Sequence, residues 1–156
     1  MLALGQTCSN VTQLGFHDQG CINFDGSNDY IEVDDLAETI DTELQSDPSL
    51  TISAWVTIET MSTSGVIFQA RAGVSTDNHF ILMYHGSNNQ LTFTTKFNSV
   101  AAQCRDALSG ATGRENDGLW YHVVGTHNSS TAKSTLYVNA TQSHQVTQNN
   151  SLTEDL

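Results

Sequence analysis

Basic residues are scarce in this chain. Lys and Arg together number 5 in 156 residues, against 17 Asp and Glu, and the formal net charge is −12. Binding to nucleic acid and docking to anionic membranes both require a basic surface, so this composition disfavours both partners. The sequence also lacks any apolar run as long as the ~20 residues of a membrane-spanning helix. We therefore expect no nucleic-acid partner and no membrane insertion.

Proline and charged side chains are also few. The chain has 1 Pro, and charged residues make up 14%, compared with ~25% in an average domain. Ser, Thr, Asn and Gln supply the polarity instead, which is typical of a β-rich extracellular module. We expect a secreted protein. In a secreted eukaryotic chain, the Asn-x-Ser/Thr sequons would be glycosylation sites; they begin at Asn10, Asn128, Asn139 and Asn149.

The cysteines are odd in number: Cys8, Cys21 and Cys104. Cys8 and Cys21 are close enough in sequence to form a local disulfide, which would leave Cys104 free or paired outside the chain. Three buried thiols are the alternative interpretation. Because no Cys-x-x-Cys pair is present, a zinc ribbon or a thioredoxin-type site is disfavoured.

Short runs of alternating apolar and polar residues recur along the chain. The clearest covers 50–58, where Leu50, Ile52 and Val56 fall on one face and Thr51 and Trp55 on the other. Residues 34–48 resemble a short helical excursion, and 98–118 a long loop. Polar turns separate the remaining predicted strands, which are 21–24, 30–33, 66–68, 79–85, 91–97, 119–126 and 134–138. About eight short strands without long helices predict an all-β fold, an antiparallel two-sheet β-sandwich or jelly roll.

Four of these segments together resemble the laminin G-like and pentraxin-like branch of the concanavalin A-like lectin/glucanase superfamily. They are CINFDGSNDYIEV at 21–33, LTISAWV at 50–56, DGLWYHVVGT at 117–126 and TLYVN at 135–139. The resemblance implies a jelly-roll domain over 20–156, after a lead-in over 1–19. It also implies an extracellular recognition module within a larger protein.

The chain departs from the family pattern in three places. After the Gly-Thr strand many family members have Tyr-Asp-Gly, whereas His127-Asn128-Ser129 stands here. Family members usually carry Asp-Gly after the Tyr-Val strand, whereas Asn139-Ala140 stands here. The resemblance also implies final strands with a Phe-x-Gly-x-Ile-Asp-Glu-Val type motif, which does not occur before Leu156, and the polar segment 145–156 is not expected to close a sheet. We therefore expect the domain to lack its C-terminal strands, with a partner chain or the natural continuation completing the sheet.

Asp25 and Asp29 flank a Gly-containing turn. Two carboxylates and turn carbonyls are ligands that Ca²⁺ prefers, and in related domains such a turn contributes to a structural calcium site that a C-terminal Asp completes. An ordinary turn, in which Asp and Asn bind their own backbone, is the alternative and the default interpretation.

No group of residues predicts catalysis. Glu32, Asp34 and Glu38 resemble the acidic motif of jelly-roll glucanases, but the spacing is one residue too long for all three to share a strand face. The histidines have neither His-Glu-x-x-His nor His-x-His spacing and are expected to be hydrogen-bonded structural residues. Trp55 is either a sugar-stacking residue on a sheet face or a structural residue under a loop or the edge of the second sheet, and its recurrence in the family motif favours the structural role.

Three functions are consistent with these features. The first is a non-catalytic module that binds a glycan or an extracellular protein through loops at one end of the sandwich, and it is our expectation. The alternatives are a glycoside hydrolase-like jelly roll acting on β-glucans, and a purely structural spacer.

Overall fold

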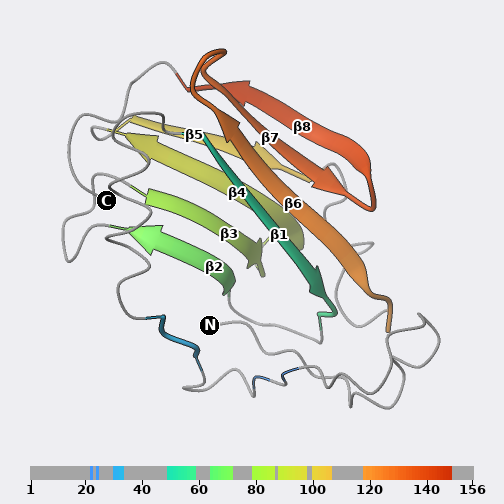
Figure 1. The fold of residues 1–156 in the computed structure, drawn as a ribbon. Coiled ribbons are helices and arrows are strands. Elements are labelled where there is room, and N and C mark those ends of the chain that lie inside the picture. Colours follow the sequence, from blue (N-terminus) through green and yellow to red (C-terminus); the bar gives the residue numbers. More distant parts are fainter. Residues whose placement is uncertain are drawn as a thin grey trace.

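The computed structural model describes residues 22, 24, 30–33, 49–58, 64–71, 79–86, 88–97, 100–106 and 118–148. These residues form eight strands in two antiparallel sheets and contain no helix, hence none that could cross a membrane (Figure 1). The prediction of an all-β, antiparallel two-sheet sandwich of the jelly-roll type is therefore confirmed.

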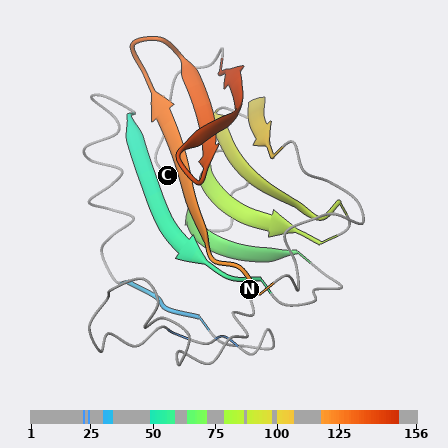
Figure 2. The same ribbon diagram turned by 90° about the vertical axis from the view of Figure 1, so that its right-hand side faces the viewer.

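Each sheet has four strands. Sheet 1 has the order β1 (Leu50–Val56), β6 (Tyr121–Asn128), β7 (Lys133–Val138) and β8 (Thr141–Thr147). Sheet 2 has the order β2 (Gly65–Arg71), β3 (His79–His85), β4 (Gln90–Phe97) and β5 (Val100–Arg105). Contacts join β4 to β7 and β5 to both β7 and β8, so the sheets stack face to face, as Figure 2 shows from the side.

The core lies between the two sheets. Because side chains alternate along a strand, one face of each sheet supplies apolar residues to this core. Sheet 2 contributes the larger side chains, which are Phe80, Leu82, Tyr84, Leu91, Phe93 and Phe97. Sheet 1 contributes Ile52, Val56, Tyr121, Val123, Leu136 and Val138. The alternation predicted for 50–58 is confirmed over 50–56, since Ile52 and Val56 are buried while Thr51 and Trp55 are exposed. Thr57, predicted on the face of Thr51 and Trp55, is buried and lies beyond the end of β1.

The structure differs from the predicted strands at three places. Residues 100–105, predicted as loop, form β5 by pairing with β4. Residues 141–147, most of them exposed, form β8 through pairing with β7. Residues 30–33 belong to no strand, and the side chains of Tyr30, Ile31 and Val33 are exposed. β5 and β8 are strands because they pair with a neighbouring strand, whereas residues 30–33 belong to none. Pairing, rather than the local sequence pattern, thus decides whether a segment forms a strand. The predicted helical excursion over 34–48 lies outside the described residues.

A two-residue turn joins β7 to β8. Val138 pairs with Thr141, and the two residues between them, Asn139 and Ala140, have φ angles of 50° and 62°. Positive φ at both positions is typical of a type I′ turn, which favours Asn followed by Gly. Ala140 therefore has a backbone conformation that a side chain disfavours.

Replacing Ala140 by Gly is expected to stabilise the domain by about 0.5–1 kcal/mol, because relief of the left-handed strain outweighs the extra flexibility of Gly in the unfolded chain. Urea unfolding would measure the change as a higher midpoint at constant slope. Ala101→Gly is the matched control, since Ala101 is an exposed residue in β5, and it should lower the stability. An Ala140→Gly midpoint at or below that of the original chain would contradict the prediction.

Candidate functional site

The outer face of sheet 1, the one turned away from sheet 2, carries an ordered set of polar and aromatic side chains. Residues that pair across neighbouring strands lie on the same face of the sheet. The strand register therefore divides the outer face of sheet 1 into rows of paired residues. Thr51, Thr126, Thr135 and Gln145 form one row across all four strands. In the next row, Ser53 pairs with Val124, and Val124 with Tyr137. Trp55 pairs with His122 in the third.

Trp55 is half exposed on this face, with 47% of its surface accessible to solvent. Its indole ring stacks on the imidazole ring of His122, with centroids 5.0 Å apart and planes inclined by 23°. The Nε2 atom of His122 lies 2.8 Å from Ser53 Oγ, a hydrogen bond that fixes the imidazole ring. The structural alternative placed Trp55 under a loop or a sheet edge, and this exposure does not fit it. The ring instead lies on the open surface, supported by His122 from its own sheet.

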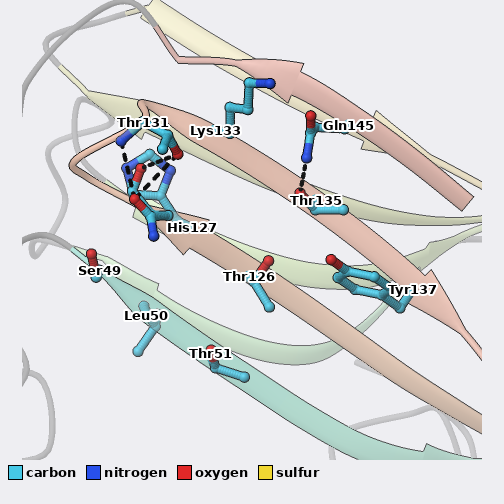
Figure 3. A pocket seen from close by; sticks show the side chains of 11 residues that line it. Ser49, Leu50, Thr51, Thr126, His127, Thr131, Lys133, Thr135, Tyr137 and Gln145 are labelled. Atoms are coloured by element: carbon cyan, nitrogen blue, oxygen red, sulfur yellow. Dashed lines mark hydrogen bonds between the residues drawn. The ribbon is translucent and has the colours of Figure 1, made fainter. Parts of the chain in front are cut away.

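A hollow of about 530 Å³ lies on the same face, and the row of Ser53 and Val124 separates the Thr51–Thr126 part of its lining from the aromatic pair. Side chains from all four strands of sheet 1 line it, as Figure 3 shows. Tyr137 lies on one side, and Lys133 and Gln145 on another. Gln145 donates a hydrogen bond from Nε2 to Thr135 Oγ1 at 2.9 Å. The hollow thus combines one aromatic ring with many uncharged hydrogen-bonding groups.

Among the residues that the structure describes, few charged side chains lie on this surface. Among the residues that line the hollow, Lys133 is the one charged side chain. Of the 17 acidic residues in the chain, Glu32 and Asp106 alone fall within the described ranges. Asp106 is buried and accepts a hydrogen bond from Ser143 Oγ at 2.8 Å. The face can therefore bind neutral polar groups without repulsion from carboxylates in the described strands.

The outer face of sheet 2 differs from that of sheet 1. Thr92 and Thr94 of β4 have 1% and 9% of their surface exposed although they point away from the core between the sheets. On neighbouring β3, Ile81 and Met83 are partly buried on this same face. β3 is an inner strand of sheet 2, between β2 and β4. Sheet 1 is consequently the sheet with the more accessible outer face.

A second polar cluster lies in the core. Ser134 Oγ is 3.0 Å from His127 Nδ1 and 2.8 Å from Thr95 Oγ1. Phe97 and Phe80 pack against the imidazole ring of His127. Ser134 is completely buried and His127 is 4% exposed. Although a serine beside a histidine resembles a nucleophile with its base, no substrate can reach this Ser134 hydroxyl. We interpret the cluster as a link between β4, β6 and β7.

Cys104 lies beside the same cluster. Its Sγ donates a hydrogen bond to the Ser134 carbonyl oxygen at 3.1 Å, and the thiol is free. Burial raises the pKa of the Cys104 thiol to about 11, so the thiol is protonated and unreactive at neutral pH. Of the two alternatives that the sequence left open for this residue, the structure supports a free, buried thiol.

The other histidines lie in different environments. His79 and His85 lie on the same face of β3, and both are partly buried. His122 is hydrogen-bonded, as expected of a structural histidine, but it also supports Trp55. His144 Nδ1 accepts a hydrogen bond from the backbone N–H of Arg105, which joins β8 to β5. No group of three His, Cys, Asp or Glu in the described ranges is arranged to hold a metal ion.

Several residues predicted from the sequence lie outside the described residues. They are Asp25 and Asp29 of the calcium prediction, Cys8 and Cys21 of the disulfide prediction, Asn10 and Asn149 of the sequons, and Asp34 and Glu38 of the acidic motif. The calcium and disulfide assignments therefore remain predictions. Glu32 is described, and it is exposed and outside any strand.

The other two sequons are at exposed hairpin turns of sheet 1. Asn128 is at the end of β6, where its Oδ1 accepts hydrogen bonds from the Thr131 backbone N–H at 3.0 Å and from Ser130 Oγ at 2.7 Å. Asn139 is in the β7–β8 turn, where its Oδ1 accepts a hydrogen bond from the His122 backbone N–H at 3.0 Å. Both side chains thus have a turn-forming role, and their glycosylation remains a prediction.

Trp55 was a candidate from the sequence, with the structural role favoured, whereas the hollow on the same face was not predicted. The sequence does indicate that Tyr137 points outward. Tyr137 lies between Leu136 and Val138, whose side chains point into the core, and side chains alternate along a strand. Gln145 had no such signal, since β8 itself was not predicted.

Comparison with known proteins gives one match. A family model described as the concanavalin A-like lectin/glucanases superfamily, of the third laminin G type, matches residues 25–155. Searches of curated proteins and of solved structures find no significant match. The matched region includes all eight strands, both sheets and the outer face of sheet 1. The chain therefore belongs to the laminin G-like domains of the concanavalin A-like lectin/glucanase superfamily.

Proposed function

We propose that this domain is a non-catalytic recognition module that binds a neutral glycan on the outer face of sheet 1. The observation that carries the proposal is the half-exposed Trp55 ring on a face rich in hydroxyl and amide groups and nearly free of charge. Sugar rings have apolar faces, which stack on aromatic rings, and rims of hydroxyl groups, which hydrogen-bond to Thr, Ser, Gln and Asn side chains. This position differs from the loops at one end of the sandwich that the sequence suggested.

The distribution of carboxylates supports a role without catalysis. Glycoside hydrolysis in the superfamily's glucanases uses two carboxyl groups about 5–5.5 Å apart in retaining enzymes. Among the described residues, Asp106 is buried against Ser143, and Glu32 is the other carboxylate. Neither is among the residues that line the hollow.

We also propose an extracellular location for the domain. One of the four sequons, at Asn139, is in an exposed turn outside the hollow, where an attached sugar would disturb neither the core nor the hollow. The low content of charged residues agrees with this location.

Binding to immobilised neutral polysaccharides, followed by isothermal titration calorimetry, tests the proposed function. We expect Trp55→Ala and Tyr137→Ala each to weaken binding about tenfold, because each removes an apolar surface on which one sugar ring stacks. Tyr30→Ala is the matched control, since Tyr30 is 70% exposed and lies in no strand, and it should leave the affinity unchanged.

Two results would argue against the proposal. If the chain binds no neutral polysaccharide, glycan recognition by this domain is excluded for the classes tested, and a protein ligand becomes the better hypothesis. If the chain binds one and both variants bind equally well, the site is elsewhere on the domain.

A further inference from the structure

Resting on the proposed function, we infer that the ligand is an extended oligosaccharide of about three or more sugar rings, which lies diagonally across β1, β6 and β7 and contacts both Trp55 and Tyr137. This inference specifies the class of glycan. It distinguishes a chain-binding site from one that recognises a single terminal sugar.

First, the two aromatic residues are too far apart to contact a single sugar ring. Trp55 is on β1 in the row of His122, whereas Tyr137 is on β7 in the adjacent row, paired with Val124 of β6. Neighbouring strands lie about 4.8 Å apart, and two residues along a strand span about 6.7 Å. Two strand spacings and one such step place the Cα atoms about 12 Å apart. One sugar ring spans only about one strand spacing, so a monosaccharide cannot stack on both rings.

The second step is the surface between the two aromatic residues. Val124 on β6 pairs with Ser53 on one side and with Tyr137 on the other. It is therefore an apolar residue in the middle of this row. Its side chain is partly buried and does not rise above the face as an aromatic ring does. A ligand chain can therefore pass over Val124 while its ends reach Trp55 on one side and Tyr137 on the other.

The third step concerns the supports of the two aromatic residues. Trp55 is held from its own sheet by stacking on His122, which in turn hydrogen-bonds to Ser53. Tyr137 forms part of the lining of the hollow, where Thr126 and Thr135 are its neighbours in the next row (Figure 3). The hollow thus offers most of the hydrogen-bonding groups, and Trp55 extends the surface beyond it. We assign the primary sugar position to the hollow and Tyr137, and a second position to Trp55.

Calorimetric titration with oligosaccharides of one to six rings, cut from the neutral polysaccharide that binds the chain, tests this inference. Affinity should rise with length up to about three or four rings and then remain constant. Trp55→Ala should lower the affinity for the longer ligands about tenfold. The affinity for the shortest ligands that bind should not change. Tyr137→Ala should weaken binding at every length. Trp55→Phe, which keeps an aromatic surface, should retain most of the increase with length.

The outcomes separate this inference from the proposed function. Equal affinity for one and six rings, or a Trp55→Ala loss that is the same at every length, would overturn the extended binding mode while leaving glycan recognition in place. Absence of binding at all lengths and to the parent polysaccharides would overturn both. Tyr30→Ala, whose site is off the sheet face, should follow the unmodified chain at each length.

Discussion

Gly125→Ala is expected to destabilise the domain by about 3 kcal/mol, the upper part of the range for overpacking a core. A Cβ atom on Gly125 would lie 2.4 Å from Cδ2 and 2.7 Å from Cγ of the Phe93 ring. Gly125 is on β6 of sheet 1 and Phe93 on β4 of sheet 2, so the two sheets approach closely at this point. Because Phe93 is completely buried in a densely packed core, its ring has no space into which to move.

Urea unfolding of Gly125→Ala measures this effect, and the double variant Gly125→Ala/Phe93→Leu shows its cause. If the clash with the ring is responsible, shortening Phe93 should recover part of the loss, so that the double variant is more stable than the sum of the single changes predicts. Ala101→Gly and Ala140→Gly show how much a change of one methyl group outside the core alters the unfolding midpoint. An unchanged unfolding midpoint for Gly125→Ala would show that the sheets can separate at this point without cost.

The role of Gly125 illustrates which features the sequence could not predict. Its place in a strand was predicted correctly from the alternation of the apolar residues around it. Its contact with Phe93 joins two residues 32 positions apart on different sheets, and no local pattern encodes that distance. The strand at 50–56 was found for the opposite reason, because burial of one face imposes a period of two on the residues themselves. The strand at 79–85 was found from its continuous apolar run, which indicates apolar residues on both faces.

The two missed strands, β5 and β8, are both edge strands. An edge strand is paired on one side only, and β8 buries few of its side chains. Its sequence, TQSHQVT, therefore carries little apolar signal. The same limit applies to the candidate site. Trp55 could be identified because its strand alternates so clearly, whereas the hollow depends on the register of four strands and on a strand that the sequence did not reveal.

The core cluster centred on Ser134 leads to the second large effect. Ser134→Ala is expected to destabilise the domain by about 2–3 kcal/mol, because it removes the hydroxyl group that bonds to both Thr95 and His127 between the sheets. No cavity explains such a loss, since Ala is smaller than Ser by a single oxygen atom. The cost arises instead because the Thr95 hydroxyl, on a residue with no exposed surface, loses its hydrogen-bond partner.

The chain contains a matched control for this change. Ser53 also hydrogen-bonds to a histidine, His122, at 2.8 Å, but this pair is exposed to solvent. Water replaces a lost partner at an exposed position, so Ser53→Ala should change the unfolding free energy by no more than about 0.5 kcal/mol. Ser134→Ala/Thr95→Val, which removes both hydroxyl groups, should be more stable than the sum of the two single changes. Equal losses for Ser53→Ala and Ser134→Ala in urea unfolding would mean that burial does not strengthen this hydrogen bond, and the cluster would then contribute no more to joining the sheets than a surface contact does.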